Sequence, residues 1–313
     1  MNTHSKKRLR IATRKSPLAL WQAQHVARQI ATHNPGTEIE LVPLRTEGDR
    51  ITHVPLGKIG GKGLFVKELE YALLEGRADI AAHSIKDVPI QFPAGLHLPV
   101  ILPRAEPRDA FVALGAGTLK ALPERAKVGT CSLRRKCQLR AHRPDLELLD
   151  LRGNVDTRLR KLGTDGLDAI ILAAAGLQRL GLDERIGELL PIDIMLPAIG
   201  QGAIGIECRE HDAAIEALIA PLNHAPTATC VRAERAMNAV LGGSCQVPIA
   251  AYASIQKDHL HLRGLVGRLD GSQLLREEGY ASTAEPDKLG QQIAAALLER
   301  GAAELLASIA AGD

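Results

Sequence analysis

The chain has 313 residues, of which 45% are hydrophobic, and carries a formal net charge of +3. This length exceeds what one small core needs, so two or three domains are expected, and no apolar run reaches the roughly 18 residues of a membrane-spanning helix. The five cysteines include no Cys-x-x-Cys pair and the basic start lacks the apolar segment of a signal peptide, which predicts a cytoplasmic protein without a disulfide framework or zinc site.

The first part of the chain alternates strand-like apolar runs with helical patterns. Strands are predicted at 9–13, 38–44 and 79–83, and helices at 17–32 and 64–75. A second cycle predicts strands at 110–114, 127–129, 146–150 and 169–172, and helices at 133–141 and 155–162. Such alternation is typical of α/β layers with a mostly parallel sheet, so two α/β units are expected.

Two segments with proline or glycine, 102–107 and 196–202, are predicted to cross between these units, which means that the chain returns to its first domain. From about residue 227 the pattern changes to one helix, three strands at 247–255, 260–266 and 273–282, and alanine-rich helices over 285–310. The predicted domains are 1–102 with 203–221, then 107–197, then 222–313.

Basic residues are concentrated at 127–161, which holds ten lysines and arginines against four acids. The cluster either binds an anionic ligand or is a solvated basic face. Seven aromatic residues in the whole chain are too few for base stacking, and neither zinc-finger nor basic-zipper spacing occurs. We therefore expect no nucleic-acid partner.

Helix caps next to arginines recur at the predicted strand ends. A cap of this kind is most often structural, since it contributes about 1 kcal/mol without any ligand. The repeated pairing of a cap with an arginine favours a carboxylate-binding site, because guanidinium groups and helix N-termini both bind carboxylates. The residues concerned are Ser16 with Arg14, then Thr130 and Ser132 with Arg134 and Arg135, then Asn154 with Arg152 and Arg158.

Polar residues follow the strand predicted at 79–83, in the sequence His-Ser-Ile-Lys-Asp-Val-Pro. Ligands of open α/β sheets bind at the carboxyl ends of strands, which makes Ser84, Lys86 and Asp87 candidate site residues. Asp87 beside Lys86 is equally compatible with a surface pair or a turn. The histidines show no metal-ligand spacing, so no metal is expected.

Cys245 follows a predicted helix, on a Gly-Gly-Ser turn in the sequence ERAMNAVLGGSCQVPIA over 234–250. A lone cysteine is usually an inert small hydrophobic residue. This segment, however, resembles the cofactor-attachment signature of the porphobilinogen deaminase family, and residues 83–89 resemble that family's HS-x-KD-x-P motif. The resemblance spans essentially the whole chain.

The resemblance implies the fold: two α/β domains like those of periplasmic solute-binding proteins with a cleft between them, plus a smaller C-terminal α+β domain. It also implies a dipyrromethane cofactor joined by a thioether to Cys245, with Asp87 as the catalytic carboxylate. The implied reaction joins four porphobilinogens head to tail with loss of ammonia and releases hydroxymethylbilane by hydrolysis, for tetrapyrrole and haem synthesis in a monomeric enzyme. Loss of ammonia leaves a cationic azafulvene, which a carboxylate can stabilise.

Further site residues follow from the same resemblance. Residues 49–62 match a flap over the cleft, which brings Lys58 and Lys62 to carboxylates, while Phe65 either stacks on a pyrrole or belongs to a core. The loop over 58–65 lacks the ending of a P-loop, so nucleotide binding is weakly supported. Cys131 departs from the serine that relatives carry there. Residues that match contacts to cofactor or substrate carboxylates are Arg14, Ser16, Ser132, Arg134, Arg135, Arg152, Arg158 and Arg179, and Gln201 matches another cleft position.

Two other functions remain open from the residues alone. A two-lobed module that binds or senses a small dicarboxylate would have the same α/β layers, although it needs no third domain with a cysteine. A cysteine hydrolase would use Cys245 directly, but the neighbouring sequence offers no convincing histidine partner.

Overall fold

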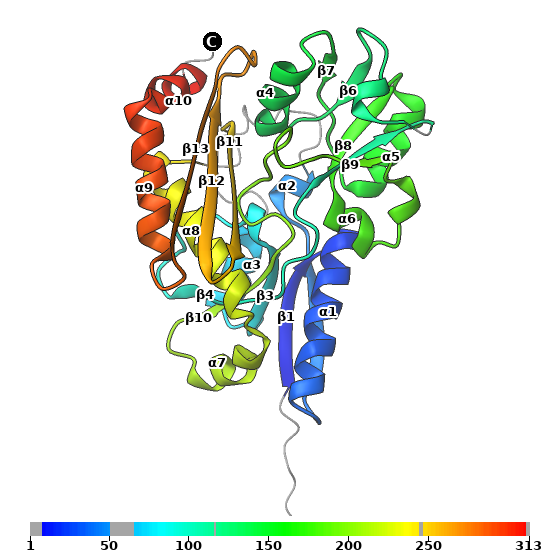
Figure 1. Ribbon diagram of the computed structural model, residues 1–313. Coiled ribbons are helices and arrows are strands. Elements are labelled where there is room, and N and C mark those ends of the chain that lie inside the picture. The colour runs from blue at the N-terminus through cyan, green and yellow to red at the C-terminus, as the bar shows by residue number, and fades with distance from the viewer. Residues whose placement is uncertain (1–7, 51–65, 116, 244–246, 311–313) are drawn as a thin grey trace, which may run out of the picture. The chain divides into compact units, whose positions relative to one another are not determined.

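The computed structural model of the chain describes residues 8–50, 66–115, 117–243 and 247–310, and Figure 1 shows their strands and helices. These residues fall into two compact units. The first unit holds 8–50, 66–104 and 203–228, and the second holds 105–115, 117–202, 229–243 and 247–310. Within these ranges no helix is both long enough and apolar enough to cross a membrane.

The first unit is built around a five-stranded sheet with the strand order β2-β1-β3-β10-β4. Its strands are β1 (Arg8–Arg14), β2 (Glu38–Leu44), β3 (Ile80–Ser84), β4 (Leu96–Ile101) and β10 (Ile204–Arg209). Its helices include α1 (Pro17–His33), α2 (Glu47–Arg50), α3 (Lys67–Leu74) and α7 (Ala213–Ile219).

Different helices cover the two faces of this sheet. Leu9 and Ile11 of β1 pack with Val26 of α1 in one core, and Figure 1 shows α1 running along β1. Ala12 packs instead with Leu69 of α3 in a second core. Successive side chains of a strand point to opposite faces, which is why β1 serves both cores.

The second unit contains another five-stranded sheet, with the strand order β7-β6-β8-β5-β9. Its strands are β5 (Asp109–Ala113), β6 (Lys127–Gly129), β7 (Glu147–Leu149), β8 (Ala169–Ala173) and β9 (Glu188–Leu189), and its helices include α4 (Leu133–His142), α5 (Val155–Thr164) and α6 (Ala174–Arg179). Val112 of β5 packs with Leu162 of α5, whereas Phe111 packs with Leu139 of α4 on the opposite face.

Each of these sheets has one strand that runs against the others. In the first sheet β10 is antiparallel to both of its neighbours, β3 and β4. In the second sheet β5 is antiparallel to β8 and β9, while the remaining pairings are parallel. The predicted mostly parallel α/β sheets are therefore confirmed. The reversed strand in each is the first one in the chain after a predicted crossing segment.

A smaller α+β part of the second unit completes the predicted fold class. Its antiparallel strands β11 (Ile249–Gln256), β12 (His259–Gly267) and β13 (Leu274–Ser282) lie in sequence order. Helices α8 (Ala225–Leu241), α9 (Pro286–Glu299) and α10 (Ala302–Ala310) contribute to a core on one face of this sheet, and Figure 1 shows α9 alongside it. Leu265 on the other face packs with Cys137 of α4 and with Leu196.

Several elements escaped the sequence prediction, namely β4, β9, β10, α2, α6 and α7. Pro99 interrupts the pattern of β4, which the sheet tolerates because β4 is an edge strand. Strand β10 carries the charged residue Glu207, which is only 1% exposed. A buried charge and a proline are both unusual in strands, and so the hydrophobic pattern was weak at these positions. The boundaries of the three predicted domains remain a prediction.

Replacement of Gly290 in α9 should destabilise the protein even though alanine favours helices. A Cβ atom at this position would contact the carbonyl oxygen of Ala233 and lie 2.7 Å from the backbone nitrogen of Met237, both in α8. Backbone atoms cannot relieve the contact by changing rotamer. We therefore expect Gly290→Ala to lower the free energy of unfolding by about 1–3 kcal/mol in a urea titration.

The neighbouring position provides the control for that titration. Gln291 is exposed, and Gln291→Ala should change the free energy of unfolding by less than about 0.5 kcal/mol. Equal stability of Gly290→Ala and the wild type would show that α8 and α9 do not approach as closely as described.

Candidate functional site

The first unit has a pocket at the carboxyl ends of its parallel strands β1 and β3. Polar and charged side chains from separate segments line it together with apolar ones. The lining residues are Arg14, Ser16, Leu18, Ala19, Gln22, Val66, Leu69, Ala82, His83, Ser84 and Asp87. Four residues predicted from the sequence to belong to a site, Arg14, Ser16, Ser84 and Asp87, therefore lie in one pocket.

The start of α1 shapes one side of this pocket. The Ser16 hydroxyl accepts a hydrogen bond from the backbone N–H of Ala19 at 3.4 Å, and Pro17 takes the first helical position, where its missing N–H costs nothing. This predicted cap is confirmed. Gln22, one turn further on, donates from Nε2 to the Ser84 hydroxyl at 2.7 Å. The helix thereby holds the side chain that ends β3.

Asp87 lies just beyond β3, in a single turn of 3₁₀ helix, η2 (Ile85–Asp87). The backbone N–H of Ile85 donates to the carbonyl of Ala203 at 3.1 Å, and that of Val88 donates to the carbonyl of Ile85 at 3.0 Å. These bonds fix the turn, so the half-buried Asp87 carboxylate faces the pocket from a rigid position. Lys86 beside it is also half-buried.

One part of this region was missed by the sequence reasoning, which assigned no role to His83. Its Nε2 atom lies 2.7 Å from Oε2 of Glu207 on β10, and both side chains are almost completely buried. Burial, followed by the charge of Glu207, raises the pKa of Glu70 on α3 to about 7. No sequence signal could have joined these residues, because they come from three distant segments.

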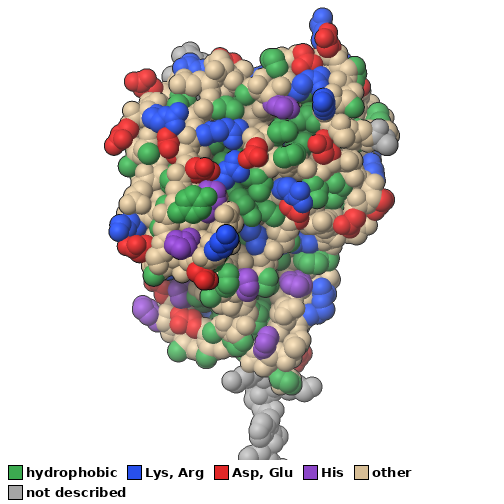
Figure 2. Space-filling view, viewed as in Figure 1, with side chains coloured by type: hydrophobic (Ala, Val, Ile, Leu, Met, Phe, Trp, Pro, Cys, Tyr) green, Lys and Arg blue, Asp and Glu red, His purple; other side chains and the backbone are tan. Residues whose placement is uncertain are grey.

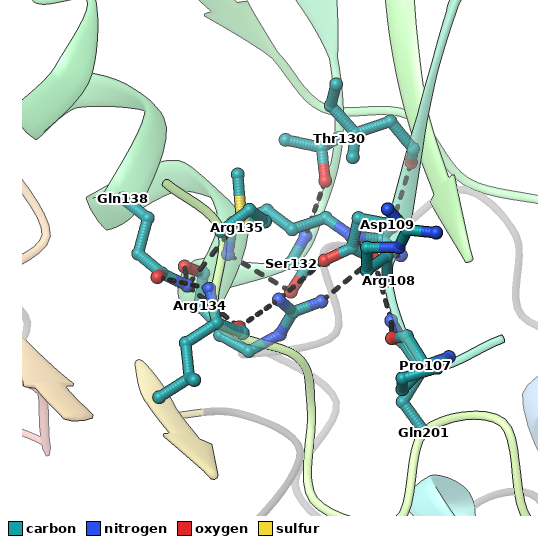
Figure 3. Close-up of polar contacts among 12 residues, drawn as sticks. Pro107, Arg108, Asp109, Thr130, Ser132, Arg134, Arg135, Gln138 and Gln201 are labelled. Atoms are coloured by element: carbon teal, nitrogen blue, oxygen red, sulfur yellow. Dashed lines mark hydrogen bonds and ion pairs between the residues drawn. The ribbon is translucent and has the colours of Figure 1, made fainter. Parts of the chain in front are cut away.

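The second unit contains a buried carboxylate between two arginines, which Figure 3 shows. Arg134 donates from Nη1 to Oδ2 of Asp109 at 2.7 Å, and Arg135 donates from Nη2 to Oδ1 at 2.7 Å. Asp109 is fully buried, and each arginine is only 5% exposed. Burial alone would raise the pKa of Asp109, but the charges and hydrogen bonds of Arg134 and Arg135 hold this pKa far below its usual range.

The same cluster reaches into the second crossing segment. Arg134 also donates to the carbonyl of Leu196 at 2.7 Å, and Gln201 donates from Nε2 to Asp109 at 3.0 Å and to the carbonyl of Pro107 at 2.7 Å. Asp109 was not among the predicted residues. The signal for it was a charge at the start of an otherwise apolar strand, followed by two arginines at a helix start.

Two of the predicted caps of this unit, Ser132 and Asn154, are confirmed as N-caps, whereas Thr130 precedes the helix. The Ser132 hydroxyl accepts from the backbone N–H of Arg135 at 3.4 Å, and the Thr130 hydroxyl accepts from the backbone N–H of Ser132 at 3.2 Å. At α5, Asn154 accepts from the backbone N–H of Thr157 at 2.9 Å.

The other predicted arginines are half-buried. Arg152 precedes the α5 cap, and Arg158 donates from Nε to the carbonyl of Gly153 at 2.7 Å. Arg179 at the end of α6 donates to the carbonyl of Gly202 at 2.6 Å, and burial lowers its pKa to about 10. Arg152 and Arg158 therefore lie around the start of α5, and Arg179 is the last residue of α6.

On the face shown in Figure 2, lysines and arginines lie among acidic and apolar side chains. Of the basic residues at 127–161, Arg134 and Arg135 are buried, so this stretch is more than the solvated basic face that its composition allowed.

Four predicted residues, Lys58, Lys62, Phe65 and Cys245, lie outside the described residues. On either side of Cys245, α8 ends at Leu241 and β11 begins at Ile249. In the part of the chain that the structure describes, no group of three or more His, Cys, Asp or Glu side chains is arranged to hold a metal ion.

Two family models match the chain. Residues 9–217 match the porphobilinogen deaminase dipyrromethane cofactor binding domain, and residues 228–299 match the porphobilinogen deaminase C-terminal domain. Together the two matches cover both α/β sheets and most of the α+β part.

Solved structures with similar folds have low sequence identity. The periplasmic aliphatic sulphonate binding protein SsuA from Escherichia coli is 16% identical, over 95% of this chain and 88% of its own, with a TM-score of 0.43. A YaeC-family lipoprotein from Enterococcus faecalis is 14% identical, over 69% of this chain and 90% of its own, with a TM-score of 0.42.

Removal of the Asp109 charge should destabilise the second unit. Asp109→Asn would leave two buried guanidinium groups without their carboxylate, so we expect a loss of about 3–5 kcal/mol in the free energy of unfolding at pH 7. Because the pKa of Asp109 is lowered in the folded state, the loss should shrink as the pH falls below about 4, where the carboxylate of the unfolded chain is protonated. Urea titrations at several pH values measure both effects.

An exposed ion pair offers the comparison. Asp150 pairs with Lys136 at 2.6 Å and its side chain is 51% exposed, so Asp150→Asn should cost no more than about 1 kcal/mol. Similar losses for the two variants would contradict the role given to burial.

Proposed function

The chain belongs to the porphobilinogen deaminase family, and from this we propose that it joins four porphobilinogen molecules head to tail, with loss of ammonia, and then releases hydroxymethylbilane by hydrolysis. It is an enzyme, a hydroxymethylbilane synthase of the transferase class that serves tetrapyrrole biosynthesis. Its cofactor is dipyrromethane, since the larger matched domain is the one that binds this group.

The proposed site rests on one observation. Arg14, Ser16, Ser84 and Asp87 come from separate turns and strand ends, yet they line one pocket. The substrate pyrrole carries an acetate, a propionate and an aminomethyl group. A guanidinium with a helix N-terminus suits the carboxylates, and a carboxylate suits the positive charge that develops when ammonia leaves.

Asp87 is the proposed catalytic residue. Its carboxylate would lie near the pyrrole nitrogen, stabilise the developing positive charge and accept or return a proton there. Two features support this role. The turn of η2 fixes the backbone of Asp87, and the hydrogen bond from Gln22 fixes the adjacent Ser84 hydroxyl, so little reorganisation is needed when charge develops.

The second unit has residues that fit the carboxylates of the cofactor. Arg134 and Arg135 share one carboxylate, Asp109, so this buried cluster has one more positive than negative charge. Such an excess favours an anionic group nearby. Dipyrromethane, when bound, supplies the pyrrole carbon to which the first substrate is added. We propose that this chain holds and orients its acetate and propionate groups through Thr130, Ser132, Arg134, Arg135, Arg152, Asn154, Arg158 and Arg179.

Cys245 is the proposed attachment point, through a thioether that forms once and does not turn over. Lys58, Lys62 and Phe65 are proposed to meet substrate as part of a flap, and Lys86 and Gln201 to contact it. We further propose that the enzyme is a cytoplasmic monomer that binds neither nucleic acid nor membranes.

The attachment can be tested by intact mass. We expect the purified protein to exceed its sequence mass by two pyrrole units and to give a colour with Ehrlich's reagent, and we expect Cys245→Ser to lose both signals. Cys131→Ser is the control and should keep them. An active protein at its sequence mass would refute the proposed mechanism.

The role of Asp87 can be tested by kinetics. Asp87→Asn keeps the shape of the side chain but removes its charge and proton-accepting capacity, so kcat should fall by about 10²–10⁴-fold. The Asp87→Asn variant should still carry the cofactor, which its intact mass will show. Glu38, an exposed carboxylate on β2, provides the control Glu38→Gln, whose kcat should not change. A wild-type kcat for Asp87→Asn would remove Asp87 from the mechanism.

A further inference from the structure

Three ionisable side chains are buried together between the first sheet and α3. They are Glu70 on α3, His83 on β3 and Glu207 on β10, with exposed fractions of 6%, 5% and 1%. His83 Nε2 lies 2.7 Å from Glu207 Oε2. Buried ionisable groups are costly unless each charge is compensated, so a cluster of two carboxylates and one imidazole needs an explanation.

The sheet register brings two of the three together. Strands β3 and β10 are antiparallel, with Gly205 opposite His83 and Glu207 opposite Ala81. Directly opposed residues share a face, so the His83 and Glu207 side chains project to the same side, which is the side that α3 covers.

The charge of the cluster depends on the proton of Glu70. Whatever charge the His83 and Glu207 pair carries, the cluster gains one negative charge when the Glu70 carboxyl loses its proton. His83 Nε2 and both carboxylate oxygens of Glu207 have no hydrogen bond of normal geometry among the described residues, so a further carboxylate charge is costly here.

Burial, and next the charge of Glu207, raise the pKa of Glu70 to about 7, while His83 and Lys67 act in the opposite direction. Arg10, Asp79 and Arg209 pair with one another on the neighbouring strands and loop. The other charged or titratable groups on the elements packed against the cluster are Lys67, Glu68 and Tyr71 on α3, Arg8 and Arg14 on β1, Lys86 and Asp87 in η2, His97 on β4 and Cys208 on β10.

The cluster adjoins the proposed site directly. His83 is the residue before Ser84, and its side chain lines the same pocket as Arg14, Ser84 and Asp87. Little solvent separates the cluster from the pocket, so a charge on the cluster interacts strongly with charged groups in the pocket.

We propose that Glu70, His83 and Glu207 form a positioning cluster that holds one exchangeable proton beneath the Ser84–Asp87 segment, and that loss of this proton weakens binding of the carboxylate-bearing substrate. The inference rests on the proposed function. When Glu70 releases its proton to solvent, the cluster gains one negative charge beside the pocket. The new charge repels the acetate and propionate of porphobilinogen, so KM rises with pH, whereas kcat is affected less.

Kinetics give the first arm of the test. Between pH 6 and pH 8 we expect KM of the wild type to rise by about threefold to tenfold, and Glu70→Gln to remove most of this rise because its amide stays neutral. Glu75→Gln changes an exposed carboxylate just after α3 and should keep the wild-type profile. An unchanged KM profile in Glu70→Gln would overturn the proposal.

Thermal unfolding gives a second arm that does not depend on activity. The pKa of folded Glu70, about 7, lies above its ordinary value of 4.5. The stability contributed by the protonated carboxyl is therefore complete below pH 4.5 and is lost as the pH rises through 7. Glu70→Gln lacks this loss, so its Tm relative to the wild type should increase from pH 5 to pH 8, whereas the Tm difference of Glu75→Gln should stay constant. A constant difference for Glu70→Gln would overturn the proposal.

A further variant covers the case in which Glu70→Gln does not fold. Glu207→Gln removes the charge that helps to raise the pKa of Glu70, so the pH-dependent loss of Tm should move to lower pH, and an unmoved loss would overturn the proposal. Failure of the proposed function has a different signature. No release of ammonia from porphobilinogen by the wild type or by Glu75→Gln at any pH would reject that function, while the Tm arm would still decide whether the cluster holds its proton.

Discussion

A single buried carboxylate organises the second unit. Asp109 begins β5, and through Arg134 and Arg135 it fixes the first turn of α4, while Gln201 ties it to the second crossing segment. In a buried site these charges must remain paired, because none of them can be solvated in place. The start of a strand, a helix and a crossing segment are therefore held in register by one residue. Arginines that the sequence suggested only for ligands also have this structural role.

Glu234 connects separate elements of the α+β part in a similar way. Its fully buried carboxylate accepts from the backbone N–H of Gly200 at 2.6 Å and from that of Ala253 at 2.8 Å. It thus joins α8, β11 and the second crossing segment. Glu234 belongs to the 234–250 segment that first suggested the family, so part of that signature has a structural reason. The segment that carries Cys245 is connected to a rigid framework at both of its described ends.

The candidate site of the first unit lies where its two hydrophobic cores meet. Strand β3 sends Ser84 toward α1 and His83 toward α3, so the same strand end presents a hydroxyl fixed by Gln22 and an imidazole buried against Glu207. Asp87 follows directly after this strand. The pocket consequently combines one rigid carboxylate with a buried group of neighbours whose charge depends on pH, and both follow from the alternation of side chains along one strand.

The sequence by itself determined what depends on neighbouring residues. The caps at Ser16, Ser132 and Asn154, the alternation of strands and helices, and the motif around Asp87 all arise from local preferences and short-range hydrogen bonds. Only the tertiary structure decided which distant residues meet. It joined Asp109 to Arg134, reversed β5 and β10 in their sheets, and buried Glu70 with His83 and Glu207. Strand pairing and burial bring these residues together across long stretches of chain, and no local pattern encodes which strand will be the neighbour of another.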